Sequence, residues 1–544
     1  MTAKRLRVVS WFGLLFVLLT LSSVQRLVEC KNSLEPMIRK LQQREEQYKI
    51  TALTMSKSNK LSDKILRGIK QIGEKLIYLH PAESSSLYTS SLPASYANLA
   101  NIQTKNQKKN SDTSSSSSKP KNVKFQLFSK RSLPTKKNSL ANLTSFMKGG
   151  CNDKKKVLIL MSDTGGGHRA SAQALDQALN EQFPEKFDVE IMDIWTDHAN
   201  WPYNKFVPVY RYLAKHPILW RGFYAYGSFP VTKKLTEIAS WRSSFENFRR
   251  AIEASDPDFV VSVHPLTQMM PLSIVENMNK RRAIAGRDPI PFVTVVTDLG
   301  GAHRCWFDNR VDACYVPSEA VRKLALKGGI DEEKIIMKGL PIRPSFWKAS
   351  KPKLAIRKQL GLPTEGKTVL LMGGGDGVGG LGTIASEVAN KLNNLPFASQ
   401  LIVICGHNKK ILQALQDKLH PTKNLNVVVK GFVNNIDEFM SASDCLVTKA
   451  GPGTIAESMV RGLPMVISSF LPGQEAGNVP FVVNGGFGIY TGNRPKKIAD
   501  TVSTLFSNEA RLSEMSIKAK LSSHPEATVS IARDIGESLV HLMK

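Results

Sequence analysis

The chain of 544 residues is long enough for two or three domains, and its 42% hydrophobic and 22% charged residues exclude a largely disordered protein. Its formal net charge is +28, of which +18 falls in residues 1–150 and +10 in the remaining 394 residues. Most of the positive charge therefore lies outside the part of the chain that carries motifs. Because that part contains no recognisable nucleic-acid module, we expect no nucleic-acid partner. A mildly basic body instead suits diphosphate ligands and an anionic membrane surface.

The six cysteines are spread over the chain, and none belongs to a C-x-x-C pair. This spacing predicts neither a disulfide framework nor a zinc site. We therefore expect the mature protein to work in a reducing compartment.

The first 150 residues are typical of a targeting region. In residues 1–30, three basic side chains precede an apolar run that ends near Val24, as in a signal peptide. The run is marginal for crossing a bilayer, which needs about 17–25 residues, so a signal anchor is the alternative. Residues 31–150 are rich in Ser, Lys and Asn and poor in acidic residues, as in an organelle transit segment. Together they predict a two-part address to a plastid envelope, and the alternative is a disordered linker behind an endomembrane anchor.

From Lys154 onward the composition changes to alternating strand and helix patterns. An apolar strand at 157–161 is followed by a glycine-rich turn at 162–168 and then by a helical pattern. This order is typical of the opening of a doubly wound α/β domain, in which glycines let the backbone approach an anionic ligand. The turn does not fit G-x-G-x-x-G, so no dinucleotide site is predicted there. Further strands are predicted at 189–194, 259–263, 292–297 and 313–316.

The same pattern then restarts. A second opening strand at 368–372 is followed by a glycine-rich turn that begins with Gly373, Gly374 and Gly375. Later strands are predicted at 401–405, 426–429, 445–448 and 465–467. Two copies of one architecture, joined near 339–353, predict two Rossmann-like, doubly wound parallel-sheet domains that face a central cleft.

We place an N-terminal domain at 151–345 and a C-terminal domain at 346–525. The remaining residues, 526–544, are expected to form a helix that packs back on the N-terminal domain. Since ligand sites concentrate between domains, we expect the site at the boundary of the two.

The most specific segment is TKAGPGTIAE at 448–457, which follows a buried strand and opens a helix. Its turn consists of Gly451, Pro452, Gly453 and Thr454. Amides at a helix N-terminus hold a diphosphate, and Glu457, one turn into the helix, is expected to accept both hydroxyls of a ribose. About 20 residues later, Gln474 and Glu475 lie in a glycine-bounded loop that ends at Asn478 and suits the hydroxyls of a sugar. The alternative for each segment alone is a loop with capping residues.

These segments resemble the nucleotide-sugar site of the glycosyltransferases that include bacterial murein transferases and diacylglycerol glycosyltransferases. The resemblance is strongest to the monogalactosyldiacylglycerol synthase family of plant and algal plastids, and it covers about residues 155–540. The matching segments are SDTGGGHRASA (162–172), VSVHPL (261–266), TVVTDL (294–299), GLPIRPSF (339–346), LLMGGGDG (370–377), VKGFV (429–433), KAGPGTIAES (449–458) and GQEAGNVP (473–480).

The resemblance implies a GT-B fold and inverting transfer of galactose from UDP-galactose to 1,2-diacylglycerol, with formation of a β-galactolipid. It implies no metal site and no required cofactor, and it leaves open an anionic-lipid activator and a homodimer. The alternatives are transfer of glucose, another lipid acceptor, or a catalytically inactive membrane-anchored scaffold. The scaffold predicts damaged donor residues, whereas Gly451, Gly453, Glu457, Gln474 and Glu475 are all intact.

The reaction needs a base for the acceptor hydroxyl and stabilisation of the departing UDP. His168, at the tip of the first glycine-rich loop, is the first candidate base because imidazole titrates near neutral pH. Asp298 is the second candidate, with an orienting or capping role as the alternative. Arg343 is expected near the phosphates, with a surface ion pair as the alternative. The residues expected around the uracil are Gly431, Phe432 and Val433.

The acceptor comes from a membrane, so we expect an apolar docking surface on the N-terminal domain. The aromatic residues of 195–230, with basic residues among them, suit an interfacial contact with anionic lipids, although about half of the rings are expected in the core. The residues assigned to the acceptor and the membrane are Trp201, Pro202, Tyr203, His264 and Trp306. A satisfied structural histidine is the alternative for His264.

Overall fold

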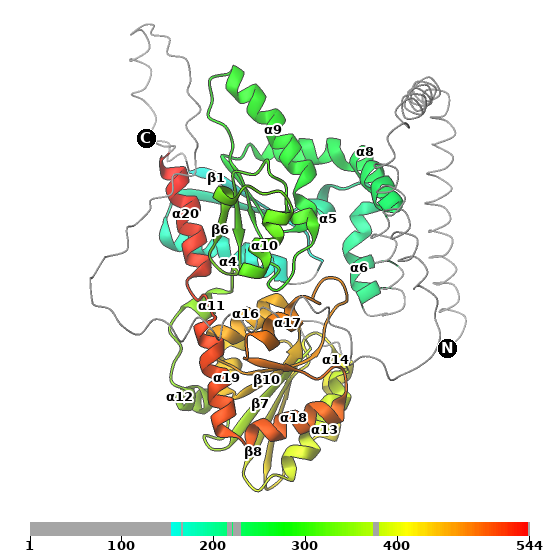
Figure 1. Ribbon diagram of the computed structural model, residues 1–544, viewed down its shortest axis with the longest axis vertical. Coiled ribbons are helices and arrows are strands. Elements are labelled where there is room, and N and C mark those ends of the chain that lie inside the picture. Colours follow the sequence, from blue (N-terminus) through cyan, green and yellow to red (C-terminus); the bar gives the residue numbers. More distant parts are fainter. Residues whose placement is uncertain are drawn as a thin grey trace, which may run out of the picture. The chain divides into compact units, whose positions relative to one another are not determined.

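The computed structural model describes residues 154–541, apart from 165–166, 215–219, 221–222, 224–229 and 374–379 (Figure 1). All described residues belong to one compact unit of the chain. The predictions for residues 1–150, Gly374 and Gly375 lie outside the described residues.

The first sheet is parallel and has the strand order β2-β1-β3-β4-β5-β6. Its strands are β1 (Lys155–Met161), β2 (Phe187–Asp193), β3 (Phe259–Ser262), β4 (Phe292–Val295), β5 (Ala313–Val316) and β6 (Ile335–Met337). The helices that follow them include α4 (Gly167–Gln182), α5 (Ile194–His198), α6 (Phe206–Ala214), α8 (Pro230–Ser255), α9 (Met269–Ile284) and α10 (Glu319–Lys327). We call this sheet and its helices the N-lobe.

The second sheet is also parallel and has the order β12-β11-β10-β7-β8-β9. Its strands are β7 (Lys367–Met372), β8 (Ser399–Ile404), β9 (Leu425–Lys430), β10 (Cys445–Lys449), β11 (Met465–Ser469) and β12 (Gly488–Tyr490). Its helices are α12 (Lys353–Gln359), α13 (Leu381–Asn393), α14 (Lys409–Lys418), α15 (Ile436–Ala442), α16 (Pro452–Val460), α17 (Asn478–Asn484), α18 (Pro495–Phe506) and α19 (Glu509–Leu521). We call this part the C-lobe.

The alternation of side chains along the central strands explains why each sheet has a core on both faces. In β1, Leu158 and Leu160 belong to the core beneath α5, α8 and α9, whereas Val157 and Ile159 belong to the core beneath α4. Successive side chains of a strand point to opposite faces, so a strand that is apolar at every position must be covered on both sides. The same alternation along β7 divides two cores in the C-lobe. The predicted fold of two doubly wound parallel sheets is therefore confirmed.

All ten predicted strands are present, with their ends shifted by a few residues. Two further strands, β6 and β12, were not predicted; they are edge strands of three residues each. Such short segments have no periodicity of their own, and they are strands because a neighbouring strand pairs with them.

The chain passes between the lobes twice. The first passage leads through α11 (Pro344–Trp347), and the second leads from α19 to α20 (Ala527–His541). The passages contact each other, since the Thr528 hydroxyl accepts from the Ile342 amide at 2.9 Å and donates to the Ile342 carbonyl at 3.0 Å. Helix α20 then packs on α4 of the N-lobe (Figure 1), where Ile531 and Ile535 complete the apolar core.

Within the described part of the chain, every helix is too short or too polar to cross a membrane.

Candidate active site

The predicted site residues follow the carboxyl ends of the strands in both sheets. In the N-lobe, the segments after β1, β3 and β4 carry the two histidines and Asp298, with His168 in the first turn of α4. In the C-lobe, loops after β10 and β11 carry the donor segments. Parallel strands place all their carboxyl ends on one edge of a sheet, which is why residues far apart in the chain meet here.

His168 lies in the first turn of α4 and is buried, so the predicted place at a loop tip is wrong. Its Nδ1 is 3.0 Å from the carbonyl of Val263 and 2.8 Å from the hydroxyl of Thr297. A carbonyl only accepts, so we assign the proton to Nδ1, which leaves Nε2 as the basic nitrogen. Burial lowers the pKa of His168 to about 4, below the neutral range that the sequence suggested.

His264 is buried against His168, with ring centroids 4.4 Å apart. Its Nδ1 accepts from the Leu266 amide at 3.1 Å, so Nε2 carries the proton and donates to the Thr164 hydroxyl at 2.8 Å. Both nitrogens are therefore used inside the protein, and burial lowers its pKa well below the ordinary value. This geometry fits the structural alternative for His264 and not a contact with the acceptor.

Asp298 is buried beside Trp306, whose indole N–H donates to the carboxylate at 2.7 Å. Burial raises the pKa of Asp298 to about 6, and hydrogen bonds from Trp306 and the backbone of His303 partly offset that rise. Trp306 is fully buried, so it does not lie on the surface as a membrane contact does. The centroid of its ring lies 6.2 Å from that of the His168 ring, so Trp306 lies beside one candidate base and bonds to the other.

On the C-lobe, the turn of Gly451, Pro452, Gly453 and Thr454 opens α16 as predicted. One turn into the helix, buried Glu457 receives two bonds of 2.6 Å from the Arg343 guanidinium. Arg343 thus pairs with Glu457 here. A carboxylate has about four acceptor positions, so this pair still leaves Glu457 able to accept from a ribose.

The loop after β11 is held from two sides. Buried Glu475 forms an ion pair with Lys449 and accepts from the Leu471 amide at 2.9 Å. Gln474 accepts a hydrogen bond on Oε1 from the hydroxyl of Tyr210, which belongs to α6 of the N-lobe. Tyr210 was predicted only as one of many aromatic residues, and Lys449 was not predicted as a site residue. Nothing in the sequence pattern distinguishes these two side chains, because their partners lie in other elements.

Asn478 connects the lobes. Its Oδ1 accepts from the Gly300 amide at 2.7 Å, and its Nδ2 donates to the Ala450 carbonyl at 2.8 Å. Because the side-chain amide is buried between two backbone segments, we find it in a structural position and not aimed at a donor.

Of the residues expected around the uracil, Phe432 is exposed and stacks on His407, with ring centroids 4.4 Å apart and planes at 10°. Val433 packs against the C-lobe core, and Gly431 lies between β9 and Phe432. Gly373 directly follows β7. The exposed stacked ring is the surface that a base can contact.

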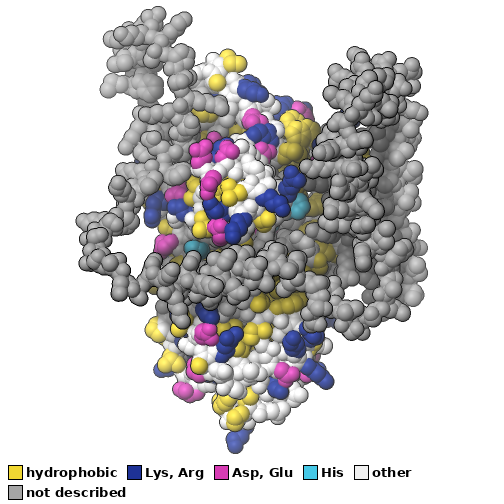
Figure 2. Space-filling model, viewed as in Figure 1, with side chains coloured by type: hydrophobic (Ala, Val, Ile, Leu, Met, Phe, Trp, Pro, Cys, Tyr) yellow, Lys and Arg dark blue, Asp and Glu magenta, His cyan; other side chains and the backbone are white. Residues whose placement is uncertain are grey.

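The aromatic segment divides between surface and core. Trp201 is 64% exposed, as a membrane contact requires, and Pro202 and Tyr203 are partly buried beside it. Tyr203 packs against the N-lobe core. On the face in Figure 2, basic side chains are scattered among acidic ones over both lobes and do not gather in one field.

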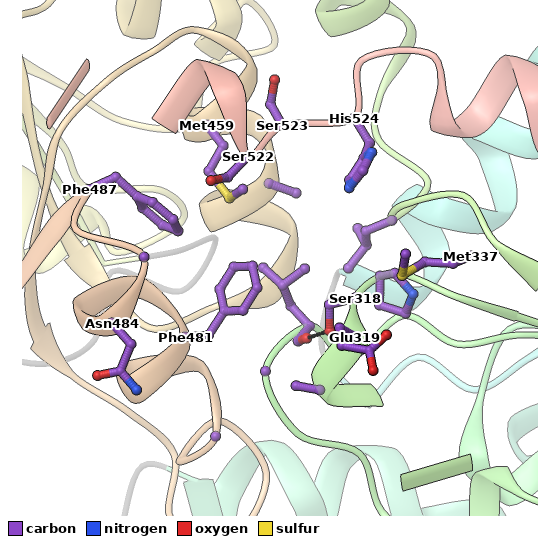
Figure 3. A pocket seen from close by; sticks show the side chains of 18 of the residues that line it. Ser318, Glu319, Met337, Met459, Phe481, Asn484, Phe487, Ser522, Ser523 and His524 are labelled. Atoms are coloured by element: carbon purple, nitrogen blue, oxygen red, sulfur yellow. Dashed lines mark hydrogen bonds between the residues drawn. The ribbon is translucent and has the colours of Figure 1, made fainter. Parts of the chain in front are cut away.

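A cavity of about 630 Å³ is lined by residues of α16 and α17 together with N-lobe residues. Figure 3 shows Phe481, Phe487 and Met459 of the C-lobe on one side of it and Met337 and Glu319 of the N-lobe on the other. None of the predicted donor residues lines it, although it borders Ala456 and Gly477, next to two of them. This apolar space is thus distinct from the donor segments.

Among the described residues, no three His, Cys, Asp or Glu side chains are grouped so that they could hold a metal ion. The arrangement offers a helix N-terminus, a buried carboxylate one turn into that helix, and two buried groups able to take a proton. These are the parts that transfer from a nucleotide sugar requires.

Comparison with known proteins agrees with this geometry. Residues 168–342 match the family model of monogalactosyldiacylglycerol (MGDG) synthase, and residues 368–531 match the glycosyltransferase family 28 C-terminal domain. The chloroplastic monogalactosyldiacylglycerol synthase of Spinacia oleracea is 43% identical over 389 residues, which are 70% of this chain and 72% of that protein. The chloroplastic monogalactosyldiacylglycerol synthase 1 of Arabidopsis thaliana is 43% identical over 390 residues, 70% of this chain and 71% of that protein.

The solved structure of Acinetobacter baumannii MurG covers 70% of this chain and 99% of its own, with 15% identity and a TM-score of 0.47, values too low to transfer any detail of the site. The two sheets and the family 28 domain define a glycosyltransferase of the GT-B class. Within that class, the chain belongs to the monogalactosyldiacylglycerol synthase family.

Proposed function

We infer that this protein transfers galactose from UDP-galactose to 1,2-diacylglycerol with inversion, and so forms the β-galactolipid of plastid membranes. Identity of 43% to chloroplastic synthases over most of both chains carries this inference. The intact donor segments of the C-lobe support it, since an inactive scaffold has no reason to keep a buried carboxylate at the start of α16. The relatives likewise support a plastid location.

In the reaction we propose, a base removes the proton of the free glycerol hydroxyl, and the oxygen attacks the anomeric carbon of galactose. The bond from that carbon to the diphosphate oxygen breaks, and UDP leaves with the electron pair. Amides of the turn before α16 and the nearby Arg343 supply positive charge for the diphosphate. We propose that these groups do so without a metal ion.

Between the two base candidates, the pKa values favour Asp298. A general base works best when its pKa lies close to the operating pH, and Asp298 at about 6 is closer than His168 at about 4. Neutral His168 then uses its basic Nε2 to accept a hydrogen bond from the acceptor or the sugar. We propose that diacylglycerol arrives from a membrane with anionic lipids, which exposed Trp201 contacts.

The experiment is transfer of radiolabelled sugar to diacylglycerol by the purified full chain in mixed micelles. UDP-galactose and UDP-glucose are offered in parallel, each with and without EDTA. We expect labelled galactolipid, little glucolipid, and no effect of the chelator. Glucolipid as the main product would move the protein to the glucose-transferring alternative, and loss of activity in EDTA would contradict metal-free stabilisation of the diphosphate.

A further inference from the structure

Helix α6 contacts both the acceptor side and the donor side of the site. Arg211 on α6 donates to the carboxylate of Asp163 at 2.8 Å and to its carbonyl at 3.2 Å, which ties the helix to the loop after β1. The preceding residue, Tyr210, donates to Gln474 in the loop after β11. Figure 1 shows α6 on the part of the N-lobe that approaches the C-lobe.

An aromatic cluster of Phe206, Tyr210, Trp220 and Phe223 holds the Tyr210 ring in place. The Trp220 ring meets that of Tyr210 edge to face, with centroids 5.2 Å apart and planes at 90°. Buried Trp220 also donates from its indole N–H to the carbonyl of Pro472 at 3.0 Å. Two hydrogen bonds from one cluster thus reach the same loop, two residues apart. Because two packed side chains of the cluster bond to this loop, the contact does not depend on the position of one side chain alone.

The side chain of Tyr210 is close enough to one carboxylate of each lobe for both charges to act on its hydroxyl. Burial raises its pKa above the ordinary value, and the nearby carboxylates of Glu475 and Asp298 raise it further. The phenol is therefore protonated at any physiological pH and is able to donate. One of these carboxylates belongs to the donor-sugar loop, and the other is the proposed base.

The consequence falls on the amide of Gln474. A glutamine side chain presents an acceptor on one side and two donor hydrogens on the other, and rotation by 180° exchanges them. When Tyr210 donates to Oε1, it fixes that side of the amide toward α6, so the two hydrogens of Nε2 face the opposite side, where a sugar hydroxyl can accept from them. Two hexoses that differ in the direction of one hydroxyl differ in whether they satisfy that fixed donor.

We propose that Tyr210 is a positioning residue that orients the Gln474 amide toward the donor sugar and thereby sets the preference for galactose over glucose. This inference rests on the proposed function, because it specifies how the same site distinguishes its donor. On this proposal, a residue on α6 of the N-lobe influences which sugar the C-lobe loop accepts.

The test compares the full-length wild type with Tyr210→Phe, which removes one oxygen and keeps the ring. Calorimetry measures binding of UDP, UDP-galactose and UDP-glucose, and the micelle assay measures transfer. We expect affinity for UDP within about twofold of the wild type, affinity for UDP-galactose lower by about tenfold, and a smaller ratio of galactose to glucose transfer. The sugar-specific loss is decisive, because a general disturbance of the fold weakens UDP as well.

Tyr315→Phe is the matched control. Tyr315 is buried in the N-lobe core, and within the described part of the chain its hydroxyl has no hydrogen-bond partner. This variant should bind all three nucleotides as the wild type does. A double-mutant cycle adds the second check: in a Gln474→Ala background, Tyr210→Phe should cause no further change in sugar preference.

The outcomes separate the two inferences. If the wild type transfers galactose and Tyr210→Phe keeps its sugar preference, the role of Tyr210 is wrong and the proposed function stands. Equal weakening of UDP and UDP-galactose by Tyr210→Phe also overturns the role, as does a full effect of the variant in the Gln474→Ala background. A wild type that binds no UDP-sugar overturns both.

Discussion

Burial moves the pKa values of the two candidate bases in opposite directions, up for Asp298 and down for His168. Asp298 rises to about 6 because its charged form is desolvated, and His168 falls to about 4 for the same reason. At pH 7, Asp298 is then mostly an anion and His168 is neutral. The same effect, desolvation, thus leaves both groups in their proton-accepting form at pH 7, and the pH at which each gains a proton distinguishes them.

We therefore predict that kcat/KM falls as pH decreases through about 6, where the buried carboxylate of Asp298 gains its proton and loses its basicity. His168 stays neutral down to about pH 4 and contributes no loss in this range. The measurement is galactosyl transfer between pH 5 and 8. Asp298→Asn should lower the rate by at least about 100-fold, as removal of a general base does.

His168→Gln is the companion variant. It should lower the rate and keep the acidic limb near pH 6, because the limb belongs to another residue. Disappearance of the limb in His168→Gln would return the role of base to the histidine, and so would a wild-type rate that stays constant from pH 8 to 5.

Among the elements, the loop after β4 and the start of α17 make a close backbone contact between the lobes. A Cβ atom on Gly300 would lie 2.2 Å from the Gly477 carbonyl oxygen, and one on Gly477 would lie 2.7 Å from the Gly300 carbonyl oxygen. Two backbones approach this closely only where both residues lack a side chain. The adjacent bond from the Gly300 amide to Asn478 then fixes the approach.

We predict that Gly300→Ala lowers galactosyl transfer at least about tenfold, because the new methyl group forces the two lobes apart and misplaces the base relative to the donor. Circular dichroism should show unchanged helix and strand content, since each sheet keeps its own core. Gly382→Ala on α13 is the control, because its Cβ meets nothing within 4 Å. Wild-type transfer by Gly300→Ala would show that this lobe contact is not needed for catalysis.

At the scale of the whole molecule, the last helix completes the core of the first lobe. Helix α20 follows the C-lobe in the chain, yet its apolar face contacts α4, and the Phe183 ring fits over Gly536 where a Cβ would clash at 2.2 Å. Ile535 and Leu539 are fully buried there. The stability of the N-lobe thus depends on residues that come about 370 positions later than its first strand, since Ile535 follows Met161 by 374 positions.

We predict that Ile535→Ala lowers the free energy of unfolding by about 2–5 kcal/mol, the usual cost of a cavity at a buried isoleucine. Urea unfolding of the full chain measures it. Ile517→Ala on α19 removes the same atoms from a side chain that is 55% exposed and should cost far less. Equal losses in the two variants would contradict the packing of α20.

The amino-acid sequence alone was enough for the two doubly wound lobes and for the glycine-rich turn that opens α16. These features are local: an apolar strand, a glycine-rich turn and a helix follow one another within about 25 residues, so their pattern is visible in the sequence itself. The edge strands β6 and β12 could not be predicted from this pattern, because pairing with a neighbouring strand, not composition, makes them strands.

The tertiary structure decided which side chains meet. Tyr210 and Gln474 are separated by 264 positions, and His168 and Thr297 by 129, so no spacing rule connects them. It likewise showed that His264 has both nitrogens bound and that Trp306 lies in the core beside Asp298. The physical reason is that partners and burial set the protonation and orientation of a polar group, and these are known only once distant segments have packed together.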